Sequence, residues 1–277
     1  MTHIQLKTAI ISGAAGGLGR ATVKLFKDNG FRIIALDVDA TRMTDLYTDE
    51  SVHAYQLDVT KSGEIRKFVD DSGIVYDGLD VLVCLAGVYD TFPLTEADPG
   101  KFKRMMDINL HGTAALVQGL LNPLVIRQGR VIVVSSESYK MQAMFQPYMV
   151  SKAALEAYCQ SARQELALKG ISLSVIRPGA IRTPLLAWMK SKEFTAQYPV
   201  FKKDLEASWQ KSLTMVGRIS DPVEVAGVVL RAAISSRPKR IYRINNNPLL
   251  KLAPLIPRRI LDRMMIRMIK NSSGVAE

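Results

Sequence analysis

A tyrosine and a lysine stand four residues apart in the segment Pro147–Leu155. On a helix, residues i and i+4 share a face, so the Tyr148 phenol and the Lys152 ammonium can approach one point. A free tyrosine titrates near about pH 10, and a neighbouring ammonium favours its phenolate. The pair is therefore a candidate acid/base for proton transfer. The same spacing recurs at Tyr198 and Lys202, so only context can distinguish the two pairs.

Seven apolar runs, separated by segments with helical periodicity, predict the strands that must position these groups. They are Thr8–Ser12, Phe31–Asp37, Val52–Asp58, Leu79–Gly87, Gly129–Ser136, Ile171–Gly179 and Arg240–Ile244. Continuous valine, isoleucine and leucine runs that alternate with helices are typical of a parallel sheet covered on both faces. The predicted fold class is therefore α/β, with a single Rossmann-like, doubly wound parallel sheet of about seven strands.

The helical segments have readable ends. Gly17–Asn29 is followed by Gly30, a plausible glycine just beyond a helix end, and another helix is expected to begin near Asp221-Pro222.

Two segments break the alternation of strands and helices. We predict one catalytic domain over 1–247, in which an aromatic-rich insert at 185–213 forms a substrate lid, and a basic amphipathic tail over 248–277.

Composition limits the class of protein. The 277 residues are 48% hydrophobic, enough for a sizeable core in one domain. Only Cys84 and Cys159 are present, so no disulfide framework is implied. No signal-peptide layout or long apolar stretch is visible, and a cytoplasmic location is expected. The net charge is +11, but 237–277 carries +8 of it, so the basicity belongs to the tail and does not indicate a nucleic-acid-binding domain.

Glycines follow the first predicted strand directly and open the next helix. Their spacing, G-x-x-x-G-x-G, permits a tight turn and a close approach of the backbone to a pyrophosphate at the helix N-terminus. A glycine-rich turn without a ligand is the alternative. The cofactor-binding residues predicted in this turn are Ser12, Gly13, Gly17, Leu18 and Gly19.

Two aspartates end the next two strands. A carboxylate at Asp37 can accept hydrogen bonds from an adenosine ribose and repels a 2′-phosphate. Neither the glycine turn nor the residue after Asp37 supplies an arginine for such a phosphate, so NAD is favoured over NADP. Asp58 and Val59 could flank the adenine. The alternative for each aspartate is that it caps a turn or a helix.

Several motifs follow one another in order along Lys7–Ile244. They are Gly13-x-x-x-Gly17-x-Gly19, Ala86-Gly87, Asn109, Ser136, Tyr148-x-x-x-Lys152 and Pro178-Gly179-x-Ile181-x-Thr183. Together they resemble the short-chain dehydrogenase/reductase family, and hydroxysteroid and retinol dehydrogenases within it. The family usually carries two asparagines where Cys84 and Leu85 stand here; those asparagines normally tie the fourth strand to its neighbours.

The resemblance implies a nicotinamide cofactor and a catalytic tetrad of Asn109, Ser136, Tyr148 and Lys152. Ser136 would hydrogen-bond the substrate oxygen, Lys152 would lower the phenol pKa and hold the nicotinamide ribose, and Asn109 would hold a relay water. Further cofactor contacts are implied at Ala86, Gly87, Pro178, Gly179, Ile181 and Thr183, besides Tyr148 and Lys152. Tyr198 has no serine at the matching offset, so we interpret it as a chance match.

Other chemistries lack support. The three histidines are scattered without ligand spacing, so no metal site is expected, and no G-x-S-x-G elbow occurs. A protein that binds NAD without turnover, or a membrane-surface interaction protein on the same scaffold, is the rival to an enzyme. Retention of all four tetrad groups argues against both.

Adaptable methionines and broad aromatic rings suit a bulky apolar ligand. The substrate-binding residues predicted on this basis are Ser136, Met141, Met144, Phe145, Tyr148, Leu186, Trp188 and Met189. A hydroxysteroid or bile acid is favoured, and a retinoid or long-chain alcohol comes next. The alternative is that these side chains pack the lid against the body.

From Pro257 onward, apolar side chains fall on one helical face and arginines lie largely opposite. Such a helix could dock on the domain with a solvated basic face, lie peripherally on an anionic membrane, cover the pocket or pack on a partner subunit. The docked helix is favoured. Family resemblance further suggests a homodimer or homotetramer formed through the helices near Lys101–Arg127 and Tyr148–Lys169.

Overall fold

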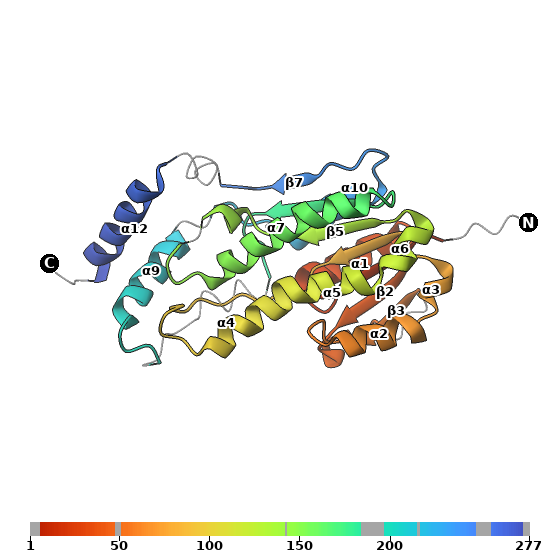
Figure 1. Ribbon diagram of the computed structural model, residues 1–277, viewed down its shortest axis with the longest axis horizontal. Helices are drawn as coiled ribbons and strands as arrows, with labels where there is room; N and C mark the ends of the chain where they lie inside the picture. The colour runs from red at the N-terminus through yellow and green to blue at the C-terminus, as the bar shows by residue number, and fades with distance from the viewer. Residues whose placement is uncertain are drawn as a thin grey trace, which may run out of the picture.

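The computed structural model describes residues 6–47, 51–141, 143–183, 197–214, 217–247 and 256–273. Its centre is a parallel sheet of seven strands in the order β3-β2-β1-β4-β5-β6-β7 (Figure 1). The strands are β1 (Thr8–Ser12), β2 (Arg32–Asp37), β3 (Val52–Gln56), β4 (Val81–Cys84), β5 (Arg130–Val134), β6 (Ser172–Pro178) and β7 (Ile241–Ile244). All seven predicted strands are confirmed.

Helices and short turns connect the strands. The long ones are α1 (Gly17–Asp28), α2 (Ser62–Asp71), α4 (Pro99–Met106), α5 (Gly112–Gly119), α6 (Leu121–Arg127), α7 (Pro147–Ala167), α9 (Lys202–Thr214), α10 (Pro222–Ile234) and α12 (Arg258–Ser273). The short ones are α3 (Ile74–Asp77), the 3₁₀ turns η1 (Ala40–Met43) and η3 (Glu137–Lys140), and the π-helical turn η2 (Asp107–His111). Both predicted helix ends are confirmed: Gly30 follows α1 with φ +76°, and Asp221 caps α10.

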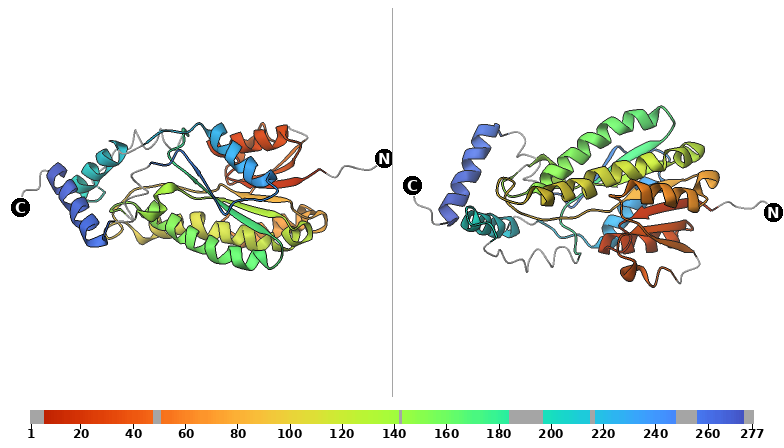
Figure 2. Two further views of the ribbon diagram at one scale, coloured as in Figure 1. Left: turned by 90° about the horizontal axis from the view of Figure 1, so that it is seen from above. Right: turned by 60° about the horizontal axis from the view of Figure 1, so that its bottom comes forward.

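Both faces of the sheet are buried. Alternate residues of one strand point to opposite sides, so Ile10 packs in the cluster that contains α2, α5 and α7, whereas Ile11 packs in the cluster that contains α1 and α10. Figure 2 shows these two helical layers on either side of the sheet. This double coverage explains why the strands read as continuous apolar runs.

The chain reverses its direction of winding between β1 and β4. From β1 it proceeds outward to β2 and β3, then returns to place β4 on the other side of β1. At such a point the segments that follow the two central strands run to opposite faces of the sheet, which leaves a crevice for a ligand outside the carboxyl ends of the strands. The predicted motifs at Gly13, Gly87 and Ser136 all lie at this edge.

The described helices of the two segments that break the alternation lie together at one end of the molecule. α9, from the predicted lid, packs against α12, from the predicted tail (Figure 1). The described part of the tail is thus a helix docked on α9, which agrees with the favoured alternative. The division into 1–247 and 248–277 and the expected dimer or tetramer stay predictions. In the described part of the chain no helix is long and apolar enough to cross a membrane.

Candidate active site

A cavity of about 1340 Å³ lies at the carboxyl edge of the sheet and extends to α9 and α12. Most of the predicted site residues line it. They are Gly13, Gly17, Leu18, Gly19, Gly87, Ser136, Met141, Met144, Tyr148, Lys152, Pro178, Gly179, Ile181 and Thr183. The fold therefore brings together residues that are up to 170 positions apart in the sequence.

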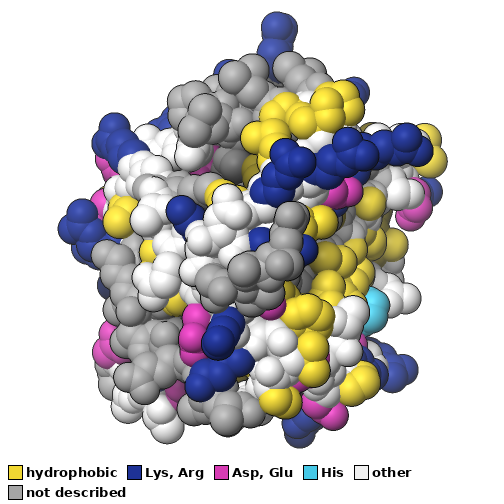
Figure 3. All heavy atoms as spheres, turned by 90° about the vertical axis from the view of Figure 1, so that its left-hand side faces the viewer, with side chains coloured by type: hydrophobic (Ala, Val, Ile, Leu, Met, Phe, Trp, Pro, Cys, Tyr) yellow, Lys and Arg dark blue, Asp and Glu magenta, His cyan; other side chains and the backbone are white. Residues whose placement is uncertain are grey.

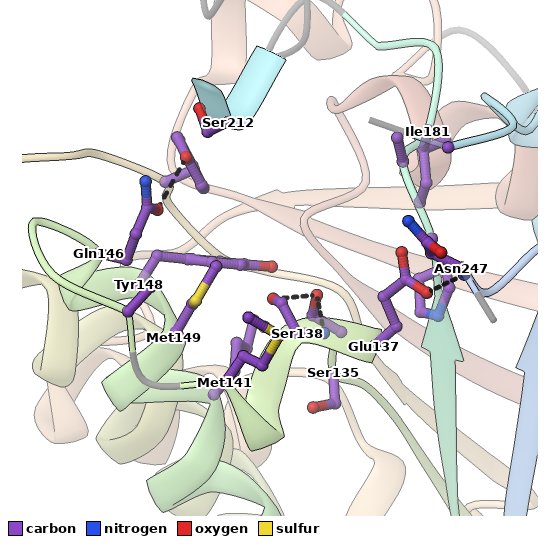
Figure 4. A pocket seen from close by; sticks show the side chains of 18 of the residues that line it. Ser135, Glu137, Ser138, Met141, Gln146, Tyr148, Met149, Ile181, Ser212 and Asn247 are labelled. Atoms are coloured by element: carbon purple, nitrogen blue, oxygen red, sulfur yellow. Dashed lines mark hydrogen bonds between the residues drawn. The ribbon is translucent and has the colours of Figure 1, made fainter. Parts of the chain in front are cut away.

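The Tyr148 side chain crosses the floor of this cavity. Pro147 occupies the first turn of α7, where a proline fits because its missing N–H needs no partner, so Tyr148 stands at the very start of the helix. Figure 4 shows its hydroxyl directed toward the serines of the loop after β5. Burial raises the pKa of Tyr148 to about 12, and a hydrogen bond from Ser136 opposes this rise.

Ser136 is fixed by its own neighbours. Its Oγ accepts a hydrogen bond from the Ser138 backbone N–H at 3.2 Å and shares another with the Ser138 hydroxyl at 2.8 Å. The serine caps η3 in this way, as serines commonly cap the start of a helical turn. Its hydroxyl is consequently held beside the Tyr148 phenol.

Lys152 follows Tyr148 by one helical turn and is buried. Its Nζ lies 5.6 Å from the centre of the Tyr148 ring and donates a hydrogen bond to the Val134 carbonyl at 3.1 Å. Burial lowers the pKa of Lys152 to about 8. The expected lowering of the phenol pKa is not found, because the cost of burying a phenolate outweighs the effect of the Ser136 hydrogen bond.

Asn109 lies beside this group but does not line the cavity. It is fully buried in the π-helical turn η2 and holds the chain after β4: its Oδ1 accepts from Val88 N–H at 2.8 Å, and its Nδ2 donates to the Val88 carbonyl at 2.9 Å. A Cβ at Gly87 would lie 3.2 Å from Asn109 Oδ1 and 3.7 Å from Lys152 Nζ. Glycine here keeps the space between the two side chains open.

The glycine turn holds β1 close to β4. Gly13 has φ +71°, and a Cβ there would lie 2.7 Å from the Ala86 nitrogen, so only glycine fits. Ser12 is buried outside the cavity. Its Oγ accepts from the N–H groups of Leu85 and Ala86 at 3.3 and 3.4 Å, which supplies a tie between β1 and the end of β4 where the family's asparagines are missing.

Asp37 stands at the end of β2, next to the glycine turn. Its carboxylate accepts from Ala15 N–H at 2.9 Å and from Asp39 N–H at 3.1 Å, so it also orders the turn. Arg42, from η1, lines the cavity and donates to the Ala15 carbonyl at 3.1 Å. Arg42 was not predicted, because it lies neither inside the glycine turn nor directly after the strand, where an arginine for a 2′-phosphate was expected.

Four predicted residues are used mainly in packing or turns. Asp58 accepts hydrogen bonds from the Thr60 N–H and hydroxyl at 2.9 and 2.8 Å. It therefore caps a turn, which was the alternative to an adenine contact. Val59 and Ala86 contact the main core, and neither lines the cavity. Phe145 packs its ring 5.5 Å from that of Phe201, at the boundary of lid and body.

The second Tyr-x-x-x-Lys pair has a different environment. Tyr198 is buried with Phe92, Met105 and Leu205, and its hydroxyl accepts a hydrogen bond from Lys101 at 2.8 Å. It does not line the cavity. The interpretation of this pair as a chance match fits its position in the lid packing.

The far end of the cavity is walled by apolar side chains from several elements. Those described are Met141, Met144, Met149, Leu261, Met264, Met265, Met268 and Ile269. The predicted substrate residues Leu186, Trp188 and Met189 lie outside the described residues. α12 thus contributes to the wall, which was one of the alternatives for the tail.

Two polar residues near Tyr148 were not foreseen. Tyr89 packs its ring 4.9 Å from that of Tyr148 and donates a hydrogen bond to Gln146 Oε1 at 3.1 Å. Gln146 is buried and lies beside Tyr148 (Figure 4). Both Gln146 and Tyr89 line the cavity. Neither belongs to a motif, and only the position of Gln146 two residues before Tyr148 could have pointed to it.

The residues present fit a dinucleotide. α1 begins at the cavity, and its N-cap residue, Gly16, provides no side chain to cap the first N–H groups, which suits a pyrophosphate. Ser135 also lines the cavity, and its buried Oγ has no hydrogen-bond partner in the described structure. Among the described residues, no group of three or more histidine, cysteine or acidic side chains could hold a metal ion.

The chain is similar to known proteins over most of its length. The sequence model of the short chain dehydrogenase family matches residues 7–193. NADPH-dependent 3-dehydrocapnine reductase from Ornithobacterium rhinotracheale is 30% identical, over 96% of this chain and 98% of that one. Galactitol 2-dehydrogenase from Agrobacterium fabrum is 28% identical, over 81% and 89%. A solved short-chain dehydrogenase from Streptomyces avermitilis superposes with a TM-score of 0.76 at 22% identity, covering 99% of each chain.

Proposed function

Because this chain belongs to the short-chain dehydrogenase family, and is therefore an NAD(P)-dependent oxidoreductase acting on alcohols or ketones, we propose that it interconverts a secondary alcohol and a ketone on a bulky apolar substrate. The observation that supports this proposal most is the cavity itself. Tyr148, Ser136 and Lys152 meet on its floor, and methionines, leucine and isoleucine wall its outer end.

Each polar group has a separate task in the proposed reaction. Tyr148 Oη exchanges a proton with the substrate oxygen, and Ser136 donates a hydrogen bond to that oxygen as charge develops on it. A nicotinamide ring, when bound, supplies or accepts the hydride. Lys152 holds the nicotinamide ribose and supplies positive charge near the phenol. Asn109 keeps its proposed place in the proton relay through its position beside Lys152.

The pKa values support this division of tasks. With its pKa raised to about 12, Tyr148 is protonated at neutral pH and is ready to protonate a ketone oxygen. With its pKa lowered to about 8, Lys152 still carries its charge at neutral pH. In the oxidative direction, this positive charge favours the phenolate that must accept the proton.

The preferred cofactor follows from the residues at the end of β2. The Asp37 carboxylate suits a ribose with a free 2′-hydroxyl, so NAD is the proposed cofactor. NADP is the alternative, and two observations favour it: the Arg42 guanidinium lines the cavity close to Asp37, and one relative is NADPH-dependent.

The substrate proposal depends on the wall of the cavity, because the relatives differ in their substrates. One acts on galactitol and another on 3-dehydrocapnine. Flexible methionine side chains adapt to large apolar shapes, whereas a polyol would need a polar group for each hydroxyl. A hydroxysteroid or bile acid is therefore proposed first, and a retinoid or long-chain alcohol second.

The test is NADH or NADPH formation at 340 nm with a panel of hydroxysteroids, bile acids, retinol, long-chain secondary alcohols and sugar alcohols. Turnover of an apolar alcohol with a kcat/KM at least about tenfold above that of any sugar alcohol is expected. A sugar alcohol as the best substrate would refute the apolar proposal. Dinucleotide binding without turnover of any alcohol would favour the rival, a non-catalytic regulator.

A further inference from the structure

The inner side of α12 faces the cavity and the helix α9. Leu261, Met265 and Ile269 follow one another at helical spacing; all three line the cavity, and Ile269 is buried. α9 packs against the same helix. α12 therefore packs against α9 and turns these three apolar side chains toward the outer end of the cavity.

The outer side of α12 carries a stripe of positive charge. Four basic residues follow at i, i+4, i+8 and i+11, and all four are exposed: Arg259, Arg263, Arg267 and Lys270. In the described part of the helix the one acidic residue is Asp262, and it pairs with Arg258 at 3.4 Å rather than with the stripe. Within the described part of the chain, Arg259, Arg263 and Arg267 form no ion pair, so the stripe presents excess positive charge to its surroundings.

Apolar side chains flank the stripe on both sides. Ile260 is 50% exposed, Met264 56% and Ile266 48%, which are large values for apolar side chains of this size. Figure 3 shows basic and hydrophobic side chains side by side on this end of the molecule. A surface that combines the two kinds of group matches an interface between charged headgroups and hydrocarbon.

The exposed face continues into the cavity. Met264 and Arg267 are exposed to solvent and also line the cavity, so the rim of the cavity and the outer face of α12 share residues. A molecule held against α12 would therefore lie at the mouth of the cavity.

We propose that α12 docks the protein on an anionic lipid surface and that apolar substrates enter the cavity from that surface. The second part rests on the proposed function, whereas the first does not. A second copy of the chain is a poorer occupant, because a two-fold contact would bring the basic stripes of two copies together. Nucleic acid would match the charge but would leave Ile260, Met264 and Ile266 without an apolar environment.

Vesicle co-sedimentation of the full chain tests the docking. Vesicles of equal parts phosphatidylglycerol and phosphatidylcholine are compared with vesicles of phosphatidylcholine alone. Since each basic residue near an anionic surface strengthens binding about fivefold, the anionic vesicles should bind at least about tenfold more protein, and salt should release it. No preference for the anionic vesicles would overturn the proposal.

A matched pair of variants locates the face. Arg259→Glu/Arg263→Glu should lower vesicle binding at least about tenfold. Arg66→Glu/Lys67→Glu makes the same change of charge on exposed residues of α2, at the other end of the molecule, and should bind as the wild type does. An equal loss in both variants would mean that net charge alone drives binding, which would overturn the assignment to α12.

Turnover separates docking from the proposed function. Both variants should oxidise a water-soluble alcohol as the wild type does, whereas only the α12 variant should lose about tenfold in rate on a substrate embedded in anionic vesicles. Vesicle binding without any turnover would refute the proposed function and leave the docking intact. A change in the sedimentation coefficient of the α12 variant, with no vesicle binding by the wild type, would assign the face to a contact between copies.

Discussion

The two ends of the cavity are built differently. The cofactor end is shaped mainly by the main chain. Gly13 allows β1 and β4 to approach each other, and the N-terminus of α1, which has no side-chain cap, opens onto the cavity. At the substrate end, methionines and other apolar side chains of the segment after η3, of α7 and of α12 form the wall. Backbone geometry tolerates few changes, whereas side chains can be exchanged singly, so the same scaffold can keep its chemistry while its substrates differ.

Lys152 lies beside the proposed acid/base, and replacing it should have a larger effect than any change at the glycine turn or in the substrate wall. Lys152→Met keeps the apolar stem but removes the charge. We expect a loss of at least about a hundredfold in kcat/KM, because both the charge near the phenol and a ribose contact disappear. Initial rates at saturating dinucleotide measure this loss, and a loss of less than about tenfold would contradict the role given to Lys152.

The same variant should be more stable than the wild type at neutral pH. The lysine pKa is lowered from 10.5 to about 8 in the folded state, so below pH 8 the fold carries a buried charge at a cost of about 3 kcal/mol. Between about pH 8 and 10.5 the folded lysine loses its proton first, and the cost fades. Thermal melts without dinucleotide should show the largest gain for Lys152→Met below pH 8 and none above about 10.5. A gain that does not depend on pH would contradict the burial argument.

Glycine substitutions test the claim that the cofactor end depends on the main chain. Gly13→Ala combines a left-handed φ with a backbone contact at 2.7 Å, and should cost about 3 kcal/mol or more of folding free energy and weaken dinucleotide binding. Gly30→Ala has a similar φ but nothing within 4 Å of the new Cβ, and should cost only about 1 kcal/mol. Urea denaturation of both variants measures the difference, and equal costs would refute the close-approach argument.

The substrate end should respond to change in a milder and more selective way. Met265→Ala enlarges the outer cavity, and should lower kcat/KM for the bulkiest alcohols about tenfold while that for a short alcohol stays within about twofold. The short alcohol is the internal control. A uniform loss across both would place Met265 in the support of the fold rather than in the substrate wall.

Arg42→Ala should have the smallest effect. If NADP binds, its 2′-phosphate lies close to Asp37 and Arg42, and the variant should bind NADP several-fold more weakly and NAD about equally well. Fluorescence titration of both dinucleotides measures the ratio. An unchanged ratio would leave Asp37 as the residue that sets the preference.

The difference between the two ends also explains how far the sequence could lead. The strands, the glycine turn and the pair Tyr148/Lys152 were predicted because strand periodicity and motif spacing are local signals that one linear sequence carries. Arg42, Tyr89 and Gln146 were missed because each reaches the cavity through tertiary packing from a turn or loop without a motif. The position of α12 against α9 and the cavity belongs to the same class, since an amphipathic pattern predicts a buried face but not what covers it.

Burial likewise changed one chemical expectation. The spacing of Tyr148 and Lys152 predicted an easily ionised phenol. Burial instead raises the pKa of Tyr148 to about 12 and lowers the pKa of Lys152 to about 8. The desolvation of a side chain depends on everything packed around it, and spacing alone does not contain that information.

The central claim, that Tyr148 is the acid/base of an oxidoreductase, is tested most directly by comparing the turnover of Tyr148→Phe and Tyr198→Phe. Both remove one phenolic hydroxyl from a Tyr-x-x-x-Lys pair, but only Tyr148 lies in the cavity. With the best alcohol of the panel and saturating dinucleotide, Tyr148→Phe should lose at least about a hundredfold in kcat with unchanged dinucleotide affinity, while Tyr198→Phe stays within about threefold of the wild type. Near-normal turnover of Tyr148→Phe, or an equal loss in both variants, would contradict the account.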